Sequence, residues 1–128
     1  MGDKSIEVYI EDKLTDSIIQ AIIAVHKTLG PGFLENIYRK SLVIELQSLD
    51  LCVETEKEIN IHYKGQIVGV HRLDILVEKQ IVMELKTVEA LSKAHYAQIR
   101  SYLQATGLKT GLLVNFATAK ADFRRIDT

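Results

Sequence analysis

The sequence predicts an α/β fold in which helices pack on the faces of one central mixed sheet, in the order ααβββαβ. Two stretches with apolar residues at helical spacing come first, and three strands with alternating apolar residues follow. A further helical stretch leads into a continuous apolar run, which is typical of a buried strand. A strand–helix–strand connection favours a right-handed crossover, so the last strand should pair in parallel with the third.

The first half of the chain predicts two amphipathic helices. Residues 1–13 are polar and mixed and are expected to be frayed, and Thr15 is expected to cap a helix that ends at Gly30-Pro31-Gly32. A second helix should run from about Phe33 to Leu49. Its expected core-facing residues are Leu34, Ile37, Tyr38, Leu42, Leu46 and Leu49. His26, near the end of the first helix, is expected to be structural rather than a ligand.

The second half predicts the sheet. The expected strands are Cys52–Lys64, Ile67–Val77, Ile81–Val88 and Leu108–Phe116, and the expected helix is Ser92–Thr106, closed by Gly107. Residues 118–128 are expected to be a tail that is flexible, adds a last strand or extends over a partner. The 128 residues, 47% of them hydrophobic, are enough for a single domain with one core, residues 1–128.

Composition narrows the range of functions. The net charge of −1 and the pI near 6.4 give no global electrostatic basis for nucleic-acid binding, which would need a local patch or a metal. Cys52 is the only cysteine, so no intrachain disulfide can form, and the lack of a signal-peptide pattern predicts a reducing, cytoplasmic location. The apolar segment Ile18–Val25 is too short and interrupted to span a membrane.

The stretch His71–Thr87 places charged residues inside two predicted strands. A three-residue loop would make Val77 face Ile81 and would place Asp74 opposite Glu84, with Cα atoms roughly 4.5–5.5 Å apart. Two facing carboxylates are destabilising unless positive charge lies between them. A loop of even length would instead place these carboxylates on opposite faces of the sheet.

Lys86 shares the strand face of Glu84 and can supply part of the positive charge, whereas a divalent cation would supply more. A plainer interpretation is a hairpin with mixed charges on a solvated face. Glu35, in the first turn of the second helix, is either an ordinary helix-start residue or a member of the same site. His95, Gln98 and Tyr102 form a stripe of hydrogen-bonding groups on the last helix, which is either functional or a solvent-facing side.

These motifs, taken in order, resemble the PD-(D/E)xK nuclease superfamily. The stretch Gly32–Tyr38 matches the Gly-x-x-Glu-x-x-Tyr signature of the GxxExxY protein family, a branch of that superfamily. Asp74, the Glu84-Leu85-Lys86 triplet, the Gln98–Leu103 helix segment and the Thr106–Phe116 stretch also look like this family, and the similarity covers about residues 14–117. One departure is Leu73, which stands where the superfamily name implies Pro.

The resemblance implies a restriction-endonuclease-like core and a metal-dependent nuclease acting on DNA, or second on RNA. It implies Asp74, Glu84 and Glu35 as ligands of Mg²⁺ or Mn²⁺, ions that prefer carboxylate and water oxygens. Lys86 would orient or deprotonate the attacking water. Residues expected to bind substrate are Gln98, Tyr102, Arg72 and Arg100, with Lys93 and Lys109 as further cations.

Alternative functions stay open at this point. A nuclease-fold module could bind nucleic acid or a protein partner without turnover, and the ordinary net charge and small size favour this alternative. A structural domain with incidental motifs is the third hypothesis. Because a domain of this size has little surface left for sequence recognition, a homodimer or a larger complex is a further expectation.

Overall fold

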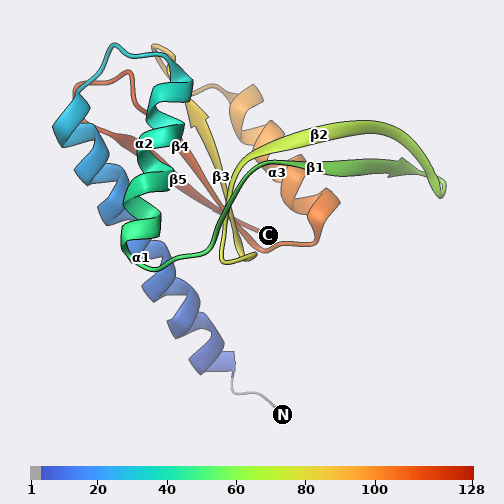
Figure 1. The fold of residues 1–128 in the computed structure, drawn as a ribbon. Helices are drawn as coiled ribbons and strands as arrows, with labels where there is room; N and C mark the ends of the chain where they lie inside the picture. Colours follow the sequence, from blue (N-terminus) through green and yellow to red (C-terminus); the bar gives the residue numbers. More distant parts are fainter. Residues whose placement is uncertain (1–3) are drawn as a thin grey trace.

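The computed structural model describes residues 4–128, with side chains described from Asp12 onward, and it has helices on both faces of a five-stranded sheet (Figure 1). The helices are α1 (Lys4–Leu29), α2 (Glu35–Ser48) and α3 (Lys93–Thr106). The strands are β1 (Val53–Tyr63), β2 (Gln66–Val77), β3 (Ile81–Lys86), β4 (Thr110–Asn115) and β5 (Asp122–Asp127). The strand order is β1-β2-β3-β4-β5, with β3 and β4 parallel and the other neighbours antiparallel. This confirms the mixed sheet and the parallel pairing predicted across the α3 crossover.

The core consists of two apolar clusters, one on each face of the sheet. Alternate residues of β3 point to opposite faces, so Met83 packs with α1 and α2 while Val82 packs with α3. Buried side chains of α2 in the first cluster are Tyr38, Leu42 and Leu46, and those of α3 in the second are Ile99, Tyr102 and Leu103. The sheet is therefore covered by separate helical layers.

The start of α1 corrects one prediction. The helix begins at Lys4 rather than near Thr15, and Thr15 is a buried residue within it. The physical reason is in the sequence, where Ile6, Ile10 and Leu14 continue the apolar spacing of four residues toward the N-terminus. Residues 1–3 of the segment predicted to be frayed lie outside the described residues.

The buried stripe of α2 is narrower than predicted. Leu34, Ile37 and Leu49 were expected in the core, yet they are 73%, 37% and 46% exposed. Leu34 is the N-cap residue and has an extended backbone, and Leu49 is the C-cap residue. Both therefore lie just outside the helix, although the prediction extended the helical periodicity to them. Predictions of core positions were thus wrong mainly at the helix ends.

The C-terminal segment adds β5 to the edge of the sheet, which is one of the outcomes that the sequence left open. Its pairing with β4 is reinforced by the Thr110 hydroxyl, which donates to Asp127 Oδ1 at 2.8 Å. His26, expected to be structural, is buried, with its Nε2 2.9 Å from the Thr118 carbonyl oxygen and its ring stacked 6.1 Å from that of Phe116. It thereby ties the end of α1 to the segment before β5.

The outer halves of β1 and β2 leave the sheet and extend past α3 as a two-stranded ribbon (Figure 1). Pairing in the ribbon continues to Tyr63 and Gln66, far beyond the part of β2 that pairs with β3. Tyr63, Ile67, Val68 and Val70 on this ribbon are all more than half exposed. No helix within residues 4–128 is long and apolar enough to cross a membrane.

Candidate active site

The β2–β3 hairpin has the predicted register. Val77 pairs with Ile81, so the connecting loop has three residues, and the ladder continues to the pair Ile75 and Met83. Pairing by backbone atoms ends there, immediately before Asp74 and Glu84. The carboxylates therefore lie where the two strands separate.

The two strand carboxylates replace the missing backbone hydrogen bonds at this split. The backbone N–H of Leu85 donates to Asp74 Oδ2 at 2.9 Å, and that of Asp74 donates to Glu84 Oε1 at 3.4 Å. Each strand thus fixes the acidic side chain of the other, and buried backbone donors that would otherwise lack partners are satisfied. The split holds Asp74 and Glu84 close together and restrained.

Negative charge is concentrated at the split. Glu84 is 4% exposed, and burial, followed by the negative charge of Asp74, raises its pKa to about 8. Burial and then Asp74 also raise the pKa of Glu35 at the start of α2. Lys86 lowers the pKa of both glutamates but does not offset the increase. The carboxylates therefore favour any added positive charge.

Arg39 is a site residue that the sequence analysis missed. Its Nη2 lies 3.5 Å from Glu35 Oε1 and 3.8 Å from Asp74 Oδ1, and its Nη1 lies 3.8 Å from Glu56 Oε1. The one available sequence signal was the spacing of four residues between Glu35 and Arg39, which places both on one side of α2. The sequence did not indicate Glu56. This residue has a backbone φ of 52° within β1, a conformation that residues other than glycine rarely adopt and that the sequence pattern does not predict.

Arg39 also lies within the expected arrangement of the acids. Glu35, Asp74 and Glu84 were predicted to converge as a tight trio, but the guanidinium lies between Glu35 and Asp74. In the part of the chain with described side chains, no group of three or more His, Cys, Asp or Glu residues is gathered closely enough to hold a metal ion. The donor chemistry nevertheless fits Mg²⁺ or Mn²⁺, because the restrained pair offers carboxylate oxygens, the ligands that these ions prefer.

Lys86 and α3 complete the neighbourhood. The Lys86 ammonium donates to Gln98 Oε1 at 2.9 Å, which joins the end of β3 to α3. Tyr102 is buried one turn further along α3, and burial, followed by the negative charge of Glu84, raises its pKa. Lys86, Gln98 and Tyr102 thus lie beside the carboxylates, as predicted. His95 does not belong with them, because its side chain caps the start of α3 by accepting from the Ser92 backbone N–H at 3.0 Å.

The two predicted substrate-binding arginines lie away from this cluster of contacts. Arg72 is on the β1–β2 ribbon and pairs with Glu58 at 3.4 Å, and its side chain is 67% exposed. Arg100 is exposed on α3. The cation in contact with the carboxylates is instead Arg39.

The loop before α2 positions Glu35. Tyr38 is fully buried, stacks 4.4 Å from the Phe116 ring and donates its hydroxyl hydrogen to the Gly30 carbonyl oxygen at 2.6 Å. The same hydroxyl accepts from the backbone N–H of Phe33 at 3.2 Å. Gly32, between these contacts, has φ of +113°, which disfavours any other residue. Glycine and tyrosine of the Gly-x-x-Glu-x-x-Tyr stretch therefore shape the turn that precedes the glutamate.

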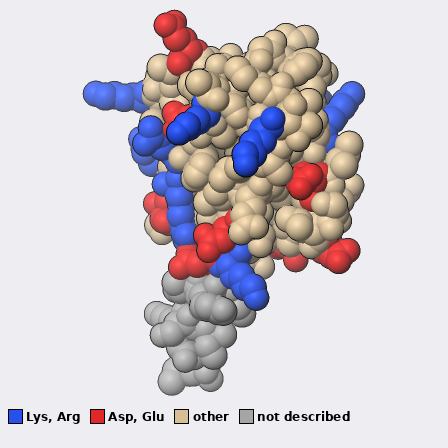
Figure 2. Space-filling view, turned by 90° about the vertical axis from the view of Figure 1, so that its left-hand side faces the viewer, with Lys and Arg blue, Asp and Glu red and all other residues tan. Residues whose placement is uncertain are grey.

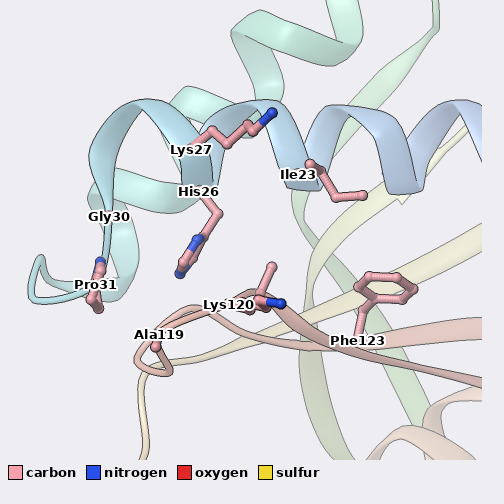
Figure 3. A pocket seen from close by; sticks show the side chains of 9 residues that line it. Ile23, His26, Lys27, Gly30, Pro31, Ala119, Lys120 and Phe123 are labelled. Atoms are coloured by element: carbon pink, nitrogen blue, oxygen red, sulfur yellow. The ribbon is translucent and has the colours of Figure 1, made fainter.

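A separate cavity of about 570 Å³ lies between the end of α1 and the segment leading to β5 (Figure 3). His26 from α1 points across it toward Ala119 and Lys120, and Ile23 and Phe123 also line it. Of the described residues that line it, none is acidic. Its apolar wall cannot supply the carboxylate chemistry of the strand split, so we do not place the active site there.

Charge on the surface agrees with the near-neutral composition. On the side of the molecule drawn in Figure 2, Lys and Arg side chains are scattered over a mainly uncharged surface, with Asp and Glu interspersed. Nucleic-acid binding on this side would lack the clustered basic residues that usually support it. Local charge at the split is therefore the stronger indication of a binding site.

The fold and the site define a class of protein, an α/β domain with two strand carboxylates and a lysine at a split in a mixed sheet. The sequence model of the PD-(D/E)XK nuclease superfamily matches residues 12–126, and the chain belongs to this superfamily. Its mixed sheet and helices are consistent with the restriction-endonuclease-like fold.

Comparison with individual proteins supports the fold and does not bear on the function. No curated protein matches the chain. The solved structure of SSO0001 is similar, with a TM-score of 0.55 and 24% sequence identity over 73% of this chain and 50% of that chain. The chain thus spans half the length of SSO0001, and the similarity indicates a shared architecture.

Proposed function

We propose that this chain is a divalent-metal-dependent nuclease of the GxxExxY branch, acting as a single domain on phosphodiester bonds in DNA, with RNA as the second candidate. The observation that supports this proposal most strongly is the restrained pair of carboxylates at the strand split, with Lys86 on the same strand face. Superfamily membership supports the reaction class, and the Gly32–Tyr38 stretch supports the branch.

In this proposal Asp74 and Glu84 hold Mg²⁺ or Mn²⁺, with Glu35 as a third ligand from α2. The ion would lower the pKa of a bound water and stabilise charge on the phosphate. Asp74 and Glu84 keep a fixed geometry because each accepts a backbone hydrogen bond from the opposite strand. The raised pKa of Glu84 means that loading requires release of its proton at neutral pH.

Lys86 orients the attacking water and offsets charge at the phosphate. Gln98 accepts a hydrogen bond from the Lys86 ammonium through its side-chain oxygen, and this contact orients the lysine near Glu84. Tyr102 lines the same side of the site, where its ring lies 5.0 Å from that of His71 on the ribbon. A lysine fixed in this way can present its ammonium group to a reacting oxygen.

A cavity of about 360 Å³ between the ribbon and α3 supports a path for the substrate. It is lined by hydrogen-bonding groups that include His62, His71, Ser101 and Gln104. A strand of nucleic acid that leaves the catalytic carboxylates by this path would pass His71 and the exposed side of α3. Arg72 and Arg100 are the proposed backbone contacts along it.

Titration calorimetry with Mn²⁺ tests the metal site. Wild type should bind Mn²⁺, and Asp74→Asn should lose binding, because a neutral amide replaces a charged ligand while its oxygen can still accept from Leu85 N–H. The matched control is Asp16→Asn, an exposed position on α1, which should bind like wild type. Equal binding by all three proteins would contradict the assignment.

Cleavage assays test the catalytic role. With single-stranded, double-stranded, flapped and RNA substrates, Lys86→Ala should lose cleavage and keep Mn²⁺ binding, whereas the exposed control Lys120→Ala should keep both.

A second function has its own support. The guanidinium of Arg39 lies among the acids, and the described side chains form no group of three or more metal ligands. These observations favour a nuclease-fold module that binds nucleic acid or a protein partner without turnover. Nucleic-acid binding by wild type with no cleavage of any substrate in Mn²⁺ would favour this module. The small size of the domain also led us to expect a homodimer. Analytical ultracentrifugation would measure whether two copies associate.

A further inference from the structure

Arg39 is held by long charge contacts rather than by close hydrogen bonds. Its three contacts to carboxylate oxygens measure 3.5, 3.8 and 3.8 Å, whereas a strong charge-assisted hydrogen bond is about 2.7–2.9 Å. Its Nε is buried and has no hydrogen-bond partner. Buried donors in folded proteins are nearly always satisfied. This guanidinium is therefore attracted to its place by charge and is not fixed there by geometry.

The acids around Arg39 are those assigned to the metal site. Glu35 lies one turn before it on α2, and Asp74 lies across the strand split. A guanidinium stays charged at any pH that the fold survives, so it always supplies one positive charge. A divalent cation at the same carboxylates would supply two charges at a smaller radius, and the two cations would repel each other.

The Arg39 side chain can move away from the acids toward solvent. The Arg39 side chain is 20% exposed, and its third partner, Glu56, is 61% exposed on β1. The guanidinium can swing toward solvent on that side while the rest of α2 stays packed through Tyr38 and Leu42. A planar guanidinium in that position is suited to a phosphate oxygen.

We infer that Arg39 is an internal counter-ion that a divalent cation displaces from Glu35 and Asp74, and that the displaced guanidinium then contacts a phosphate of the bound nucleic acid. This inference rests on the proposed metal site. It assigns opposite effects to one residue, since Arg39 opposes metal binding and favours nucleic-acid binding. A merely structural role would weaken both.

The test measures both ligands with the same full-length proteins. Mn²⁺ affinity is measured by calorimetry for wild type, Arg39→Met, Arg39→Gln and Arg39→Lys. The matched control is Arg124→Met, because Arg124 is exposed on β5, two strands away from β3, and pairs with Asp122 at 3.0 Å. Binding of a fluorescent single-stranded oligonucleotide is measured in Ca²⁺ by anisotropy. Circular dichroism verifies that each variant is folded.

Removal of the charge should tighten Mn²⁺ binding about tenfold or more, since a charge within about 4–6 Å changes an ionisation constant by that much. Arg39→Met and Arg39→Gln should both show this increase and should bind the oligonucleotide about tenfold more weakly. Arg39→Lys should stay near wild type for Mn²⁺, and Arg124→Met should leave both affinities unchanged. Two charge-removing variants keep the test decisive if one does not fold.

Each other outcome overturns the inference in a recognisable way. Unchanged or weaker Mn²⁺ binding in both folded variants, with wild type still binding, refutes displacement while leaving the proposed metal site intact. Tighter Mn²⁺ binding with unchanged oligonucleotide binding refutes the phosphate contact. If neither wild type nor the variants bind Mn²⁺, the proposed metal site fails and the inference fails with it.

Discussion

Replacing Glu84 by glutamine should change how the free energy of unfolding depends on pH. Glu84 has an ordinary pKa of 4.5 that the fold raises to about 8. Between these values the folded protein keeps a proton that the unfolded chain releases. The contribution of Glu84 to the free energy of unfolding is therefore fully present below about pH 4.5 and is lost as pH rises toward about 8. A tenfold change in an ionisation constant equals about 1.4 kcal/mol, so the total loss is at most about 5 kcal/mol.

The glutamine side chain in the Glu84→Gln protein would resemble the protonated carboxyl group, because its amide oxygen can still accept from the Asp74 backbone N–H. Urea denaturation in EDTA should therefore find the two proteins similar at pH 5 and the Glu84→Gln protein more stable by about 3–4 kcal/mol at pH 8. Histidines and the carboxylates that do not interact with Glu84 titrate alike in both proteins and cancel in the difference. A difference that does not change between pH 5 and pH 8 would refute the assignment of a buried proton to Glu84.

Other changes test the packing that supports the site. Tyr38→Phe should lower the free energy of unfolding by about 1–2 kcal/mol, because the Gly30 carbonyl oxygen loses its donor; a neutral effect would contradict the role of the hydroxyl. Gly111→Ala should cost about 1–3 kcal/mol, since its Cβ would lie 2.8 Å from Ile99 Cδ1, while Gly69→Ala, with nothing within 4 Å, is the control and should differ clearly. Asn115→Ala should cost about 1–3 kcal/mol in urea denaturation, because it leaves the half-buried backbone N–H and C=O groups of Val88 without their side-chain partner.

The hairpin could be predicted from sequence because its register follows from counting. Once the loop has three residues, the position of Asp74 beside Glu84 follows, and strand alternation places Lys86 on the same face as Glu84. The spacing of Gln98 and Tyr102 on α3 likewise predicted a hydrogen-bonding side, and the structure brings that side to Lys86.

Arg39 and Glu56 could not be found in the same way. The charge of Arg39 matters only because α2 packs beside the strand split, and that placement depends on tertiary contacts. Glu56 approaches through a left-handed backbone conformation within a strand, for which its sequence gives no indication. The errors at Leu34 and Leu49 have a simpler cause, since periodicity does not show where a helix ends.

The parting of β2 from β3 means that the acids are accessible from both layers of the molecule. Glu35 and Arg39 approach from the helix that covers one face, while Gln98 and Tyr102 approach from the helix that covers the other. A small ion bound at this seam would be in mechanical contact with both halves of the core. An ion that binds the folded protein at this seam, and not the unfolded chain, would raise the free energy of unfolding for both halves of the core together.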